Sequence, residues 1–318
     1  MAESTHRKPL ELSGALDKFQ FEDTTPEIGR EFLNVNIVDD LLQAEDADAV
    51  LRDLAITGAP PSLLAGRPRP VLTRHRTAVS TRGVVFFRAQ TNLSNELQKQ
   101  LVDRLGHLAG KPATSSVHIF PLAPAHVPEG GTPDRQISYV NSVGFRYMFD
   151  KMPGMDRRRF DAAEWHTDVQ FEPVPADYTS LRVVVLPETG GDTLWASGYE
   201  LYNRLSPPYR AFVDGLTVTC RADCVLRAVH HRGETVEEGP RGSPSNVGAA
   251  LTAVHPVVRT NPVTGWRSIF AVGQFAKRIN EVNAHESEEL LKKFYGMIQD
   301  NHDLQVRFKW RNPHDIGE

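Results

Sequence analysis

An imidazole and a carboxylate stand two residues apart near the middle of the chain, as His166 and Asp168. On a β-strand, side chains two residues apart point to the same face, so this pair would converge on one point. Such a pair supplies two of the three ligands of a facial triad, which holds Fe(II) and leaves positions open for a co-substrate and O2. Because the chain has 12 histidines, the same spacing also arises by chance, and a surface His beside an unrelated Asp stays open as the alternative.

Other histidines and both cysteines are weaker candidates for metal ligands. His255 lies at a suitable separation along the chain, but we expect a packed or hydrogen-bonded hairpin residue there. His230 and His231 stand in a polar stretch that predicts a solvated loop. Cys220 and Cys224 flank a predicted strand end, which favours two small buried side chains over a metal pair.

The 318 residues have an ordinary globular composition, with 40% hydrophobic and 24% charged residues. Lys and Arg number 36 against 40 Asp and Glu, so the net charge of −4 lacks the basic excess of a general nucleic-acid binder. No apolar run approaches the roughly 20 residues that span a bilayer, and the N-terminal residues are too polar for a signal peptide. These features predict a soluble, cytoplasmic protein with no nucleic-acid or membrane partner, and they leave open whether it forms a homo-oligomer.

The N-terminal part of the chain combines a polar stretch, two predicted helices and an insertion. Residues 1–26 are polar and weakly patterned, which predicts an extension over the surface, and residues 27–318 would form a single domain. Apolar spacing predicts helices over residues 40–55 and 97–108. Between these helices, residues 58–80 form a Pro- and Arg-rich insertion whose prolines exclude a helix or a central strand.

The rest of the chain is mostly short strands separated by turns. The predicted strands cover residues 83–87, 179–186, 216–220, 254–258, 266–272 and 304–310. Residues 261–265 form the turn of a hairpin, Ser206 and Pro207 begin a short helix, and residues 288–298 form an amphipathic helix. Helices do not alternate regularly with strands. The pattern therefore favours a mainly β fold with helices and a double-stranded β-helix (jelly-roll) core over a doubly wound sheet.

The surroundings of the His-x-Asp pair resemble the taurine dioxygenase family of Fe(II)- and 2-oxoglutarate-dependent oxygenases, especially its fungal sulfonate dioxygenase-like branch. The pair is followed by the predicted strand 179–186 and by a Gly-Gly-Asp-Thr segment that ends at Thr193. Further segments that match in the family's order are residues 82–87, 110–114, 255–265 and 304–310. The resemblance covers nearly the whole chain except the insertion at 58–80.

This resemblance implies an enzyme that binds Fe(II) through His166 and Asp168 and uses 2-oxoglutarate and O2 as co-substrates. Thr193 would hydrogen-bond a carboxylate of 2-oxoglutarate, and Val169 and Phe171 would line the substrate pocket. The implied reaction converts 2-oxoglutarate to succinate and CO2 while a small organic acid is hydroxylated. Hydroxylation beside a sulfonate carbon would release an aldehyde and sulfite, and the protein would hold the metal, exclude water and place one C–H bond.

Two positions depart from the taurine enzymes. Those enzymes read His-Ile-His-Pro where this chain has His118-Ile-Phe-Pro, so Phe120 replaces the sulfonate-binding His. His118 itself is a candidate substrate-binding residue, with a core His bonded to backbone as the alternative. Ala162 stands where the taurine enzymes have Asn. The loss of two polar anchors argues against taurine itself and leaves another sulfonate, a sulfate ester or a different small acidic substrate.

The sequence also ends before the positions of the family's distal iron His and of the Arg that pairs with 2-oxoglutarate. We therefore expect a C-terminally incomplete jelly-roll core that carries two of three iron ligands and lacks a charge-assisted partner for the co-substrate. The competing interpretation is a truncated, catalytically inactive remnant of such an enzyme. Altered splicing or gene prediction would explain both this ending and the insertion at 58–80.

Overall fold

The computed structural model describes residues 9–56, 82–123, 134–141, 165–311 and 314–317. Its helices are η1 (Ala15–Lys18), η2 (Ile37–Leu42, a π-helix), α1 (Ala47–Ala55), α3 (Asn95–Leu108), α5 (Gly198–Asn203), α6 (Pro207–Val213), α7 (Asp223–Arg232), α8 (Ala284–Asp300) and η4 (His302–Leu304). Its strands are β1 (Phe21–Asp23), β2 (Arg30–Phe32), β3 (Val85–Phe87), β4 (Leu181–Arg182), β5 (Thr193–Ala196), β6 (Thr217–Arg221), β7 (Thr252–Pro256), β8 (Val258–Thr260), β9 (Arg267–Ile269), β10 (Ala276–Ile279), β11 (Gln305–Phe308) and β12 (Ile316–Gly317).

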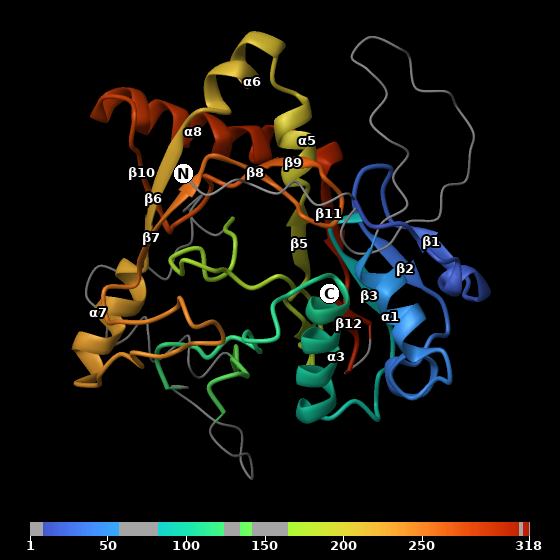
Figure 1. The fold of residues 1–318 in the computed structure, drawn as a ribbon. Helices are drawn as coiled ribbons and strands as arrows, with labels where there is room; N and C mark the ends of the chain where they lie inside the picture. Colours follow the sequence, from blue (N-terminus) through green and yellow to red (C-terminus); the bar gives the residue numbers. More distant parts are fainter. Residues whose placement is uncertain (1–8, 57–81, 124–133, 142–164, 312–313, 318) are drawn as a thin grey trace.

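A five-stranded sheet in the order β1-β2-β3-β12-β4 separates two hydrophobic clusters. Four of its strands, β1, β2, β3 and β12, are labelled in Figure 1. The strands β2 and β3 pair in parallel, and the other neighbours pair antiparallel. Alternation along β3 sends its side chains to both layers. Phe87 packs with Phe32 against α1 and α3, whereas Phe86 stacks on Phe308 with the ring centroids 3.8 Å apart.

A second core lies against α8, which crosses the upper part of the view in Figure 1, below α6. The three-stranded antiparallel sheet β10-β6-β7 packs beside this helix. Phe294 and Leu290 on the buried face of α8 join Val218 and Cys220 of β6 in one cluster. The hairpin β8–β9 forms at the predicted turn, with Val258 opposite Ile269.

The antiparallel pair β5–β11 links these layers. The predicted alternation over residues 304–310 is confirmed, because Leu304, Val306, Phe308 and Trp310 are all buried. The register places Thr193 opposite Phe308. This pairing fixes the Gly-Gly-Asp-Thr segment against an aromatic layer.

The predicted strand over residues 179–186 is wrong in its extent. Only Leu181–Arg182 forms a strand, at the edge of the five-stranded sheet, where it pairs with the two residues of β12. Val184 and Val185 continue the apolar run but are 47% and 82% exposed. A run of apolar residues resembles a buried strand, but here its second half has no strand partner among the described residues.

The N-terminal residues from Ser13 onward are more ordered than their polar composition predicts. Phe21 lies on β1, which pairs with β2, and its ring meets that of Phe32 edge to face. The carboxylate of Asp53 on α1 accepts hydrogen bonds from the backbone N–H groups of Ser13, Gly14 and Ala15. A single buried acid thus holds this segment, which polar composition alone could not reveal.

Three helix predictions need smaller corrections. The predicted helix over residues 40–55 is divided into η2 and α1. Ser206 precedes α6 as expected but makes no side-chain capping hydrogen bond. His230 and His231 are exposed as predicted, yet they lie on the last turn of α7 rather than in a loop. The insertion at 58–80 lies outside the described residues.

In the parts of the chain that the structure describes, no helix combines the length and apolar character needed to cross a bilayer.

Candidate active site

Neither His166 nor Asp168 lies on a strand, because His166 is in an irregular segment that leads into a turn beginning at Asp168. The turn nevertheless brings the two side chains together, with His166 Nε2 3.3 Å from Asp168 Oδ1. Their side chains are 37% and 51% exposed, so solvent reaches both of them. The hydrogen bond from His166 is the main cause that lowers the pKa of Asp168, against the opposing effect of burial, and Thr179 and His118 contribute further. The carboxylate is therefore ionised at neutral pH.

The backbone of this turn is held by the segment between β9 and β10. Gly273 has a φ of +81°, and a Cβ at this position would lie 2.7 Å from His166 Cα. The ring of Phe275 meets the His166 imidazole edge to face at 6.2 Å. Only a residue without a side chain fits between the two segments, so Gly273 sets how closely the His166 turn can approach.

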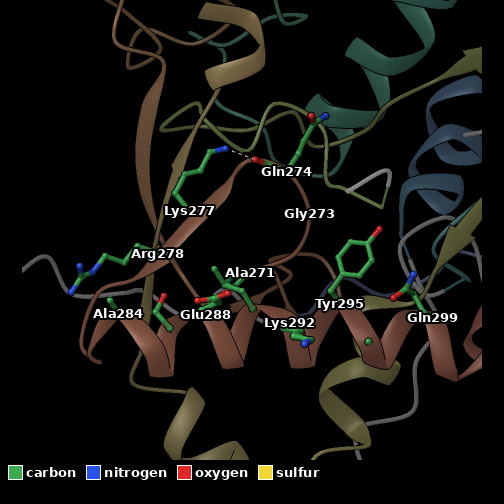
Figure 2. Close-up of a pocket in the computed structure, with 13 residues that line it drawn as sticks. Ala271, Gly273, Gln274, Lys277, Arg278, Ala284, Glu288, Lys292, Tyr295 and Gln299 are labelled. Atoms are coloured by element: carbon green, nitrogen blue, oxygen red, sulfur yellow. Dashed lines mark hydrogen bonds between the residues drawn. The ribbon is translucent and has the colours of Figure 1, made fainter. Parts of the chain in front are cut away.

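The helix α8 supports the same segment through Tyr295. The hydroxyl of Tyr295 accepts a hydrogen bond of 3.2 Å from the backbone N–H of Trp165. Figure 2 shows Tyr295 rising from α8 toward Gly273, in an open hollow of about 820 Å³ between α8 and the β9–β10 segment. At the other end of this hollow, Lys277 Nζ donates to the carbonyl of Gln274.

The residues after Asp168 turn into a small hydrophobic cluster. Phe171 is 1% exposed and packs on Phe275 with the ring centroids 5.2 Å apart. Val169 and Phe120 are partly buried against the same cluster. The φ of Val169 is +44°, which marks the tight part of the turn. Phe171 thus belongs to the packed wall behind the turn, while the roles of Val169 and Phe171 toward substrate stay predictions.

His118 reaches this wall from another part of the chain. Its Nε2 lies 3.1 Å from Glu172 Oε1, and its side chain is 14% exposed. The expectation of a backbone-bonded core His is therefore wrong, because its partner is a carboxylate. Glu172 is fully buried and forms a bidentate ion pair with Arg241. Arg241 Nε lies 2.6 Å from Glu172 Oε1, and Arg241 Nη2 lies 2.8 Å from Glu172 Oε2.

His255 is a structural residue, as predicted. It is 5% exposed, and its Nε2 lies 2.9 Å from the carbonyl of Gln170 and 3.0 Å from that of Glu172. Burial is the main cause that lowers the pKa of His255, with the charge of Arg259 adding to it. A neutral imidazole therefore supports the turn by donating through Nε2 to two backbone carbonyls. This nitrogen is occupied and is not a metal ligand in this arrangement.

Thr193 lies on β5, away from the His166 turn in the sequence. The indole Nε1–H of Trp310 donates a 3.0 Å hydrogen bond to Thr193 Oγ1. Since a hydroxyl can accept and donate at once, and no described residue accepts from Thr193 Oγ1, this O–H is available to a ligand as far as the described part of the chain shows.

The described residues offer no third candidate ligand beside His166 and Asp168. Across residues 9–56, 82–123, 134–141, 165–311 and 314–317, no three His, Cys, Asp or Glu side chains gather as a metal site requires. Burial raises the pKa of Cys220 to about 12, and it also raises the pKa of Cys224, so neither thiol is poised to bind a metal. The imidazole nitrogen and ionised carboxylate of His166 and Asp168 fit two positions of an iron centre.

Sequence reasoning missed several residues that shape this site. Glu172 closely follows the His-x-Asp pair, so a search of that segment could have found it. Nothing in the sequence pattern connects Arg241 or Gly273 with the pair, because both arrive through distant loops. Trp310 was recognised only as one face of a strand.

Solved structures define the fold. A taurine dioxygenase from Burkholderia xenovorans matches with a TM-score of 0.60 and 24% identity, over 94% of this chain and 79% of that chain. The protein therefore has the jelly-roll fold of the taurine dioxygenases, with a mixture of helices and short sheets in the described residues.

The family described as "Taurine catabolism dioxygenase TauD, TfdA family" matches residues 64–316, and the chain belongs to this family of Fe(II)- and 2-oxoglutarate-dependent dioxygenases. The alpha-ketoglutarate-dependent dioxygenase oryG of Aspergillus oryzae is 42% identical over 98% of this chain and 83% of its own length. The alpha-ketoglutarate-dependent sulfonate dioxygenase of Saccharomyces cerevisiae is 32% identical over 75% of this chain and 52% of its own length.

Proposed function

We propose that this 2-oxoglutarate-dependent dioxygenase oxidises a small organic acid and that sulfonates are the first class to test. The observation that carries the proposal is the contact between His166 and Asp168 in a partly exposed turn, within a chain of this family. The sulfonate class is supported by the name of the yeast relative and by the resemblance of the segments around the pair.

His166 and Asp168 would hold the iron. When bound, iron would couple the decarboxylation of 2-oxoglutarate to the activation of O2. The lowered pKa of Asp168 means that no proton has to leave this carboxylate before a cation binds at neutral pH. The buried wall of Phe171 and Phe275 behind the pair would keep water from one side of the metal.

Thr193 would bind 2-oxoglutarate through its hydroxyl. Trp310 occupies the acceptor side of that hydroxyl, so the O–H is oriented to donate to a carboxylate. A donor that is already oriented loses little conformational entropy when it binds its acceptor.

The reaction is tested by measuring two products on a panel of substrates. Purified protein is supplied with Fe(II), ascorbate, O2, 2-oxoglutarate and one of several alkylsulfonates, sulfate esters or carboxylic acids, and succinate and released sulfite are quantified. We expect substrate-dependent succinate, with sulfite formed in equal amount from sulfonates. Succinate without sulfite on carboxylic acids would retain the oxygenase and reject the sulfonate class. No succinate above that of a His166→Ala variant, on any compound, would contradict the proposal and favour a catalytically inactive protein.

A further inference from the structure

We propose that the buried ion pair between Glu172 and Arg241 is a positioning element for substrate recognition, which holds the His118 ring in one orientation and one tautomer beside the iron turn. This inference rests on the proposed function, because it assigns His118 to the substrate side of that site. Glu172 and Arg241 would touch neither substrate nor metal and would act through His118.

Glu172 and Arg241 are both buried and hydrogen-bonded. Glu172 is 0% exposed and Arg241 is 1% exposed. Arg241 Nε and Nη2 each bind one oxygen of the Glu172 carboxylate, while Nη1 donates to the carbonyls of Glu237 and Gly248. Replacing a buried ion pair with well-packed apolar residues is often neutral for stability. Stability alone therefore gives little reason for an ion pair at this position.

The contact between Glu172 and His118 gives a functional reason for a buried ion pair at this position. Burial alone would raise the pKa of Glu172, but the hydrogen bonds from His118 and Arg241 and the charge of Arg241 hold that pKa below its ordinary value. An ionised carboxylate has no proton to donate, so His118 Nε2 must carry the proton in this contact. Because Arg241 balances the charge of Glu172, the pair orients the imidazole without presenting an uncompensated negative charge to it. The other ring nitrogen, Nδ1, has no hydrogen bond among the described residues and is the atom left for a substrate.

The loop that carries Arg241 also grips the backbone of His118. Ser116 donates its N–H to the carbonyl of Gly242 at 2.7 Å. A Cβ on Gly242 would lie 2.7 Å from His118 Cα, so the two segments are in direct contact. Asn246 of the same loop exchanges two hydrogen bonds with the backbone of Val174, just after the iron turn. One loop thus sets the distance between His118 and the turn that carries His166 and Asp168.

His118 also borders the cluster behind the iron turn. Its ring meets that of Phe120 edge to face at 6.5 Å. Phe120 and Val169 pack in the same cluster. His118 therefore forms one edge of the region that the sequence assigns to substrate.

The first test needs neither iron nor substrate. In protein labelled with ¹⁵N-histidine, the two ring nitrogens of His118 are assigned by NMR, with a His118→Gln variant to identify the signals. We expect a single tautomer with the proton on Nε2 in the wild-type protein. In the double variant E172M/R241M, which removes both charges at once, we expect a mixture of tautomers. A wild-type ring with its proton on Nδ1, or a folded double variant with an unchanged tautomer, would overturn the proposal.

The second test separates positioning from folding through kinetics on the panel compound that the enzyme oxidises best. E172M/R241M should raise the KM for that compound about fivefold, the effect of one ordinary hydrogen bond, and leave the KM for 2-oxoglutarate nearly unchanged. In a His118→Gln background the same two substitutions should have no further effect on KM. Equal changes in both KM values, or an undiminished effect without His118, would show a merely structural pair.

Two more variants keep the tests decisive. Glu172→Asp retains the charge that balances Arg241 but withdraws the carboxylate from His118, and it should reproduce both effects if the double variant fails to fold. R88M/D315N removes another pair with a fully buried carboxylate, on the five-stranded sheet, and should leave the His118 tautomer unchanged. If no panel compound is oxidised, the proposed function fails while the tautomer experiment still decides the role of the pair.

Discussion

At the scale of single residues, the candidate chemistry depends on groups whose partners leave one function free. The hydrogen bond from His166 lowers the pKa of Asp168, and both side chains remain partly exposed. Thr193 accepts from Trp310 and keeps its own proton for another acceptor. His118 is tied to Glu172 through Nε2, which leaves Nδ1. In each case a neighbour fixes one atom and thereby defines what the other atom can bind.

Thr193 offers a test of this principle. Thr193→Val removes the acceptor of the buried Trp310 indole, and we expect the free energy of unfolding to fall by about 1–2 kcal/mol. We also expect the Kd of 2-oxoglutarate to rise about tenfold, since a charged acceptor loses its donor. Thr193→Ser keeps the hydroxyl and is the matched control. Denaturant unfolding and calorimetric titration measure both effects, and an unchanged Kd in the Val variant would contradict the assignment.

Gly273 offers a second test, of the spacing around His166. Gly273→Ala would force a methyl group against His166, and we expect weaker binding of Mn(II), used in place of iron, together with a lower melting temperature. Gly190→Ala is the matched control, because Gly190 has a similar φ of +79° but nothing within 4 Å of its Cβ position. In the control, the free energy of unfolding should fall only by the cost of a left-handed backbone conformation, about 1–2 kcal/mol. Equal metal affinity in the two variants would show that Gly273 does not set the position of His166.

At the scale of elements, the sequence predicts what local patterning controls and misses what distant contacts control. The α3 and α8 helices, the β8–β9 hairpin and the alternation before Trp310 follow from periodicity and turn residues. The strand over 179–186 fails beyond Arg182 because strand length depends on the partner strand, here the short β12. The convergence of His166 and Asp168 was expected for the wrong reason, since a turn and not a pleated strand joins them. The Glu172–Arg241 contact spans 69 residues, so no local pattern contains it.

The docking of the N-terminal segment on α1 is testable at this scale. Asp53 is fully buried and accepts four hydrogen bonds from Ser13, Gly14 and Ala15. Asp53→Asn should lower the free energy of unfolding by about 2 kcal/mol and speed amide exchange at those residues. Asp46→Asn breaks only the exposed ion pair of the same helix with Lys18 and should lower the free energy of unfolding much less, because solvent screens exposed ion pairs. Equal effects of the two variants would contradict the role given to Asp53.

At the scale of the whole molecule, the turn that carries the candidate ligands lies beside the core under α8, against which Trp165 packs. The five-stranded sheet with α1 and α3 forms one body, and α8 with the three-stranded sheet forms the other. His255 on β7 braces the turn through the carbonyls of Gln170 and Glu172. Stability and site geometry are therefore coupled through one buried neutral imidazole.

This coupling predicts a dependence of stability on pH. Since burial lowers the pKa of His255 below its ordinary value of 6.5, the unfolded chain takes up a proton at a higher pH than the folded chain does. The contribution of His255 is thus fully present above about pH 6.5 and declines as the pH falls toward the folded-state pKa. His255→Gln should reduce the loss of unfolding free energy between about pH 7.5 and about pH 5.5. His285→Gln, which changes an 80% exposed side chain, should not reduce this loss. An unchanged dependence of the unfolding free energy on pH in the His255 variant would refute the prediction.

The central claim is that His166 and Asp168 hold the iron of a 2-oxoglutarate-dependent oxidation, and succinate formation tests it most directly. Succinate is measured with Fe(II), ascorbate, O2 and 2-oxoglutarate for the wild-type protein and for His166→Ala, Asp168→Ala and His285→Gln. The wild-type protein and the His285 variant should form succinate, and the other two should lose at least about 100-fold in rate. Equal succinate from the His166 or Asp168 variant, or none from the wild-type protein, would contradict the claim.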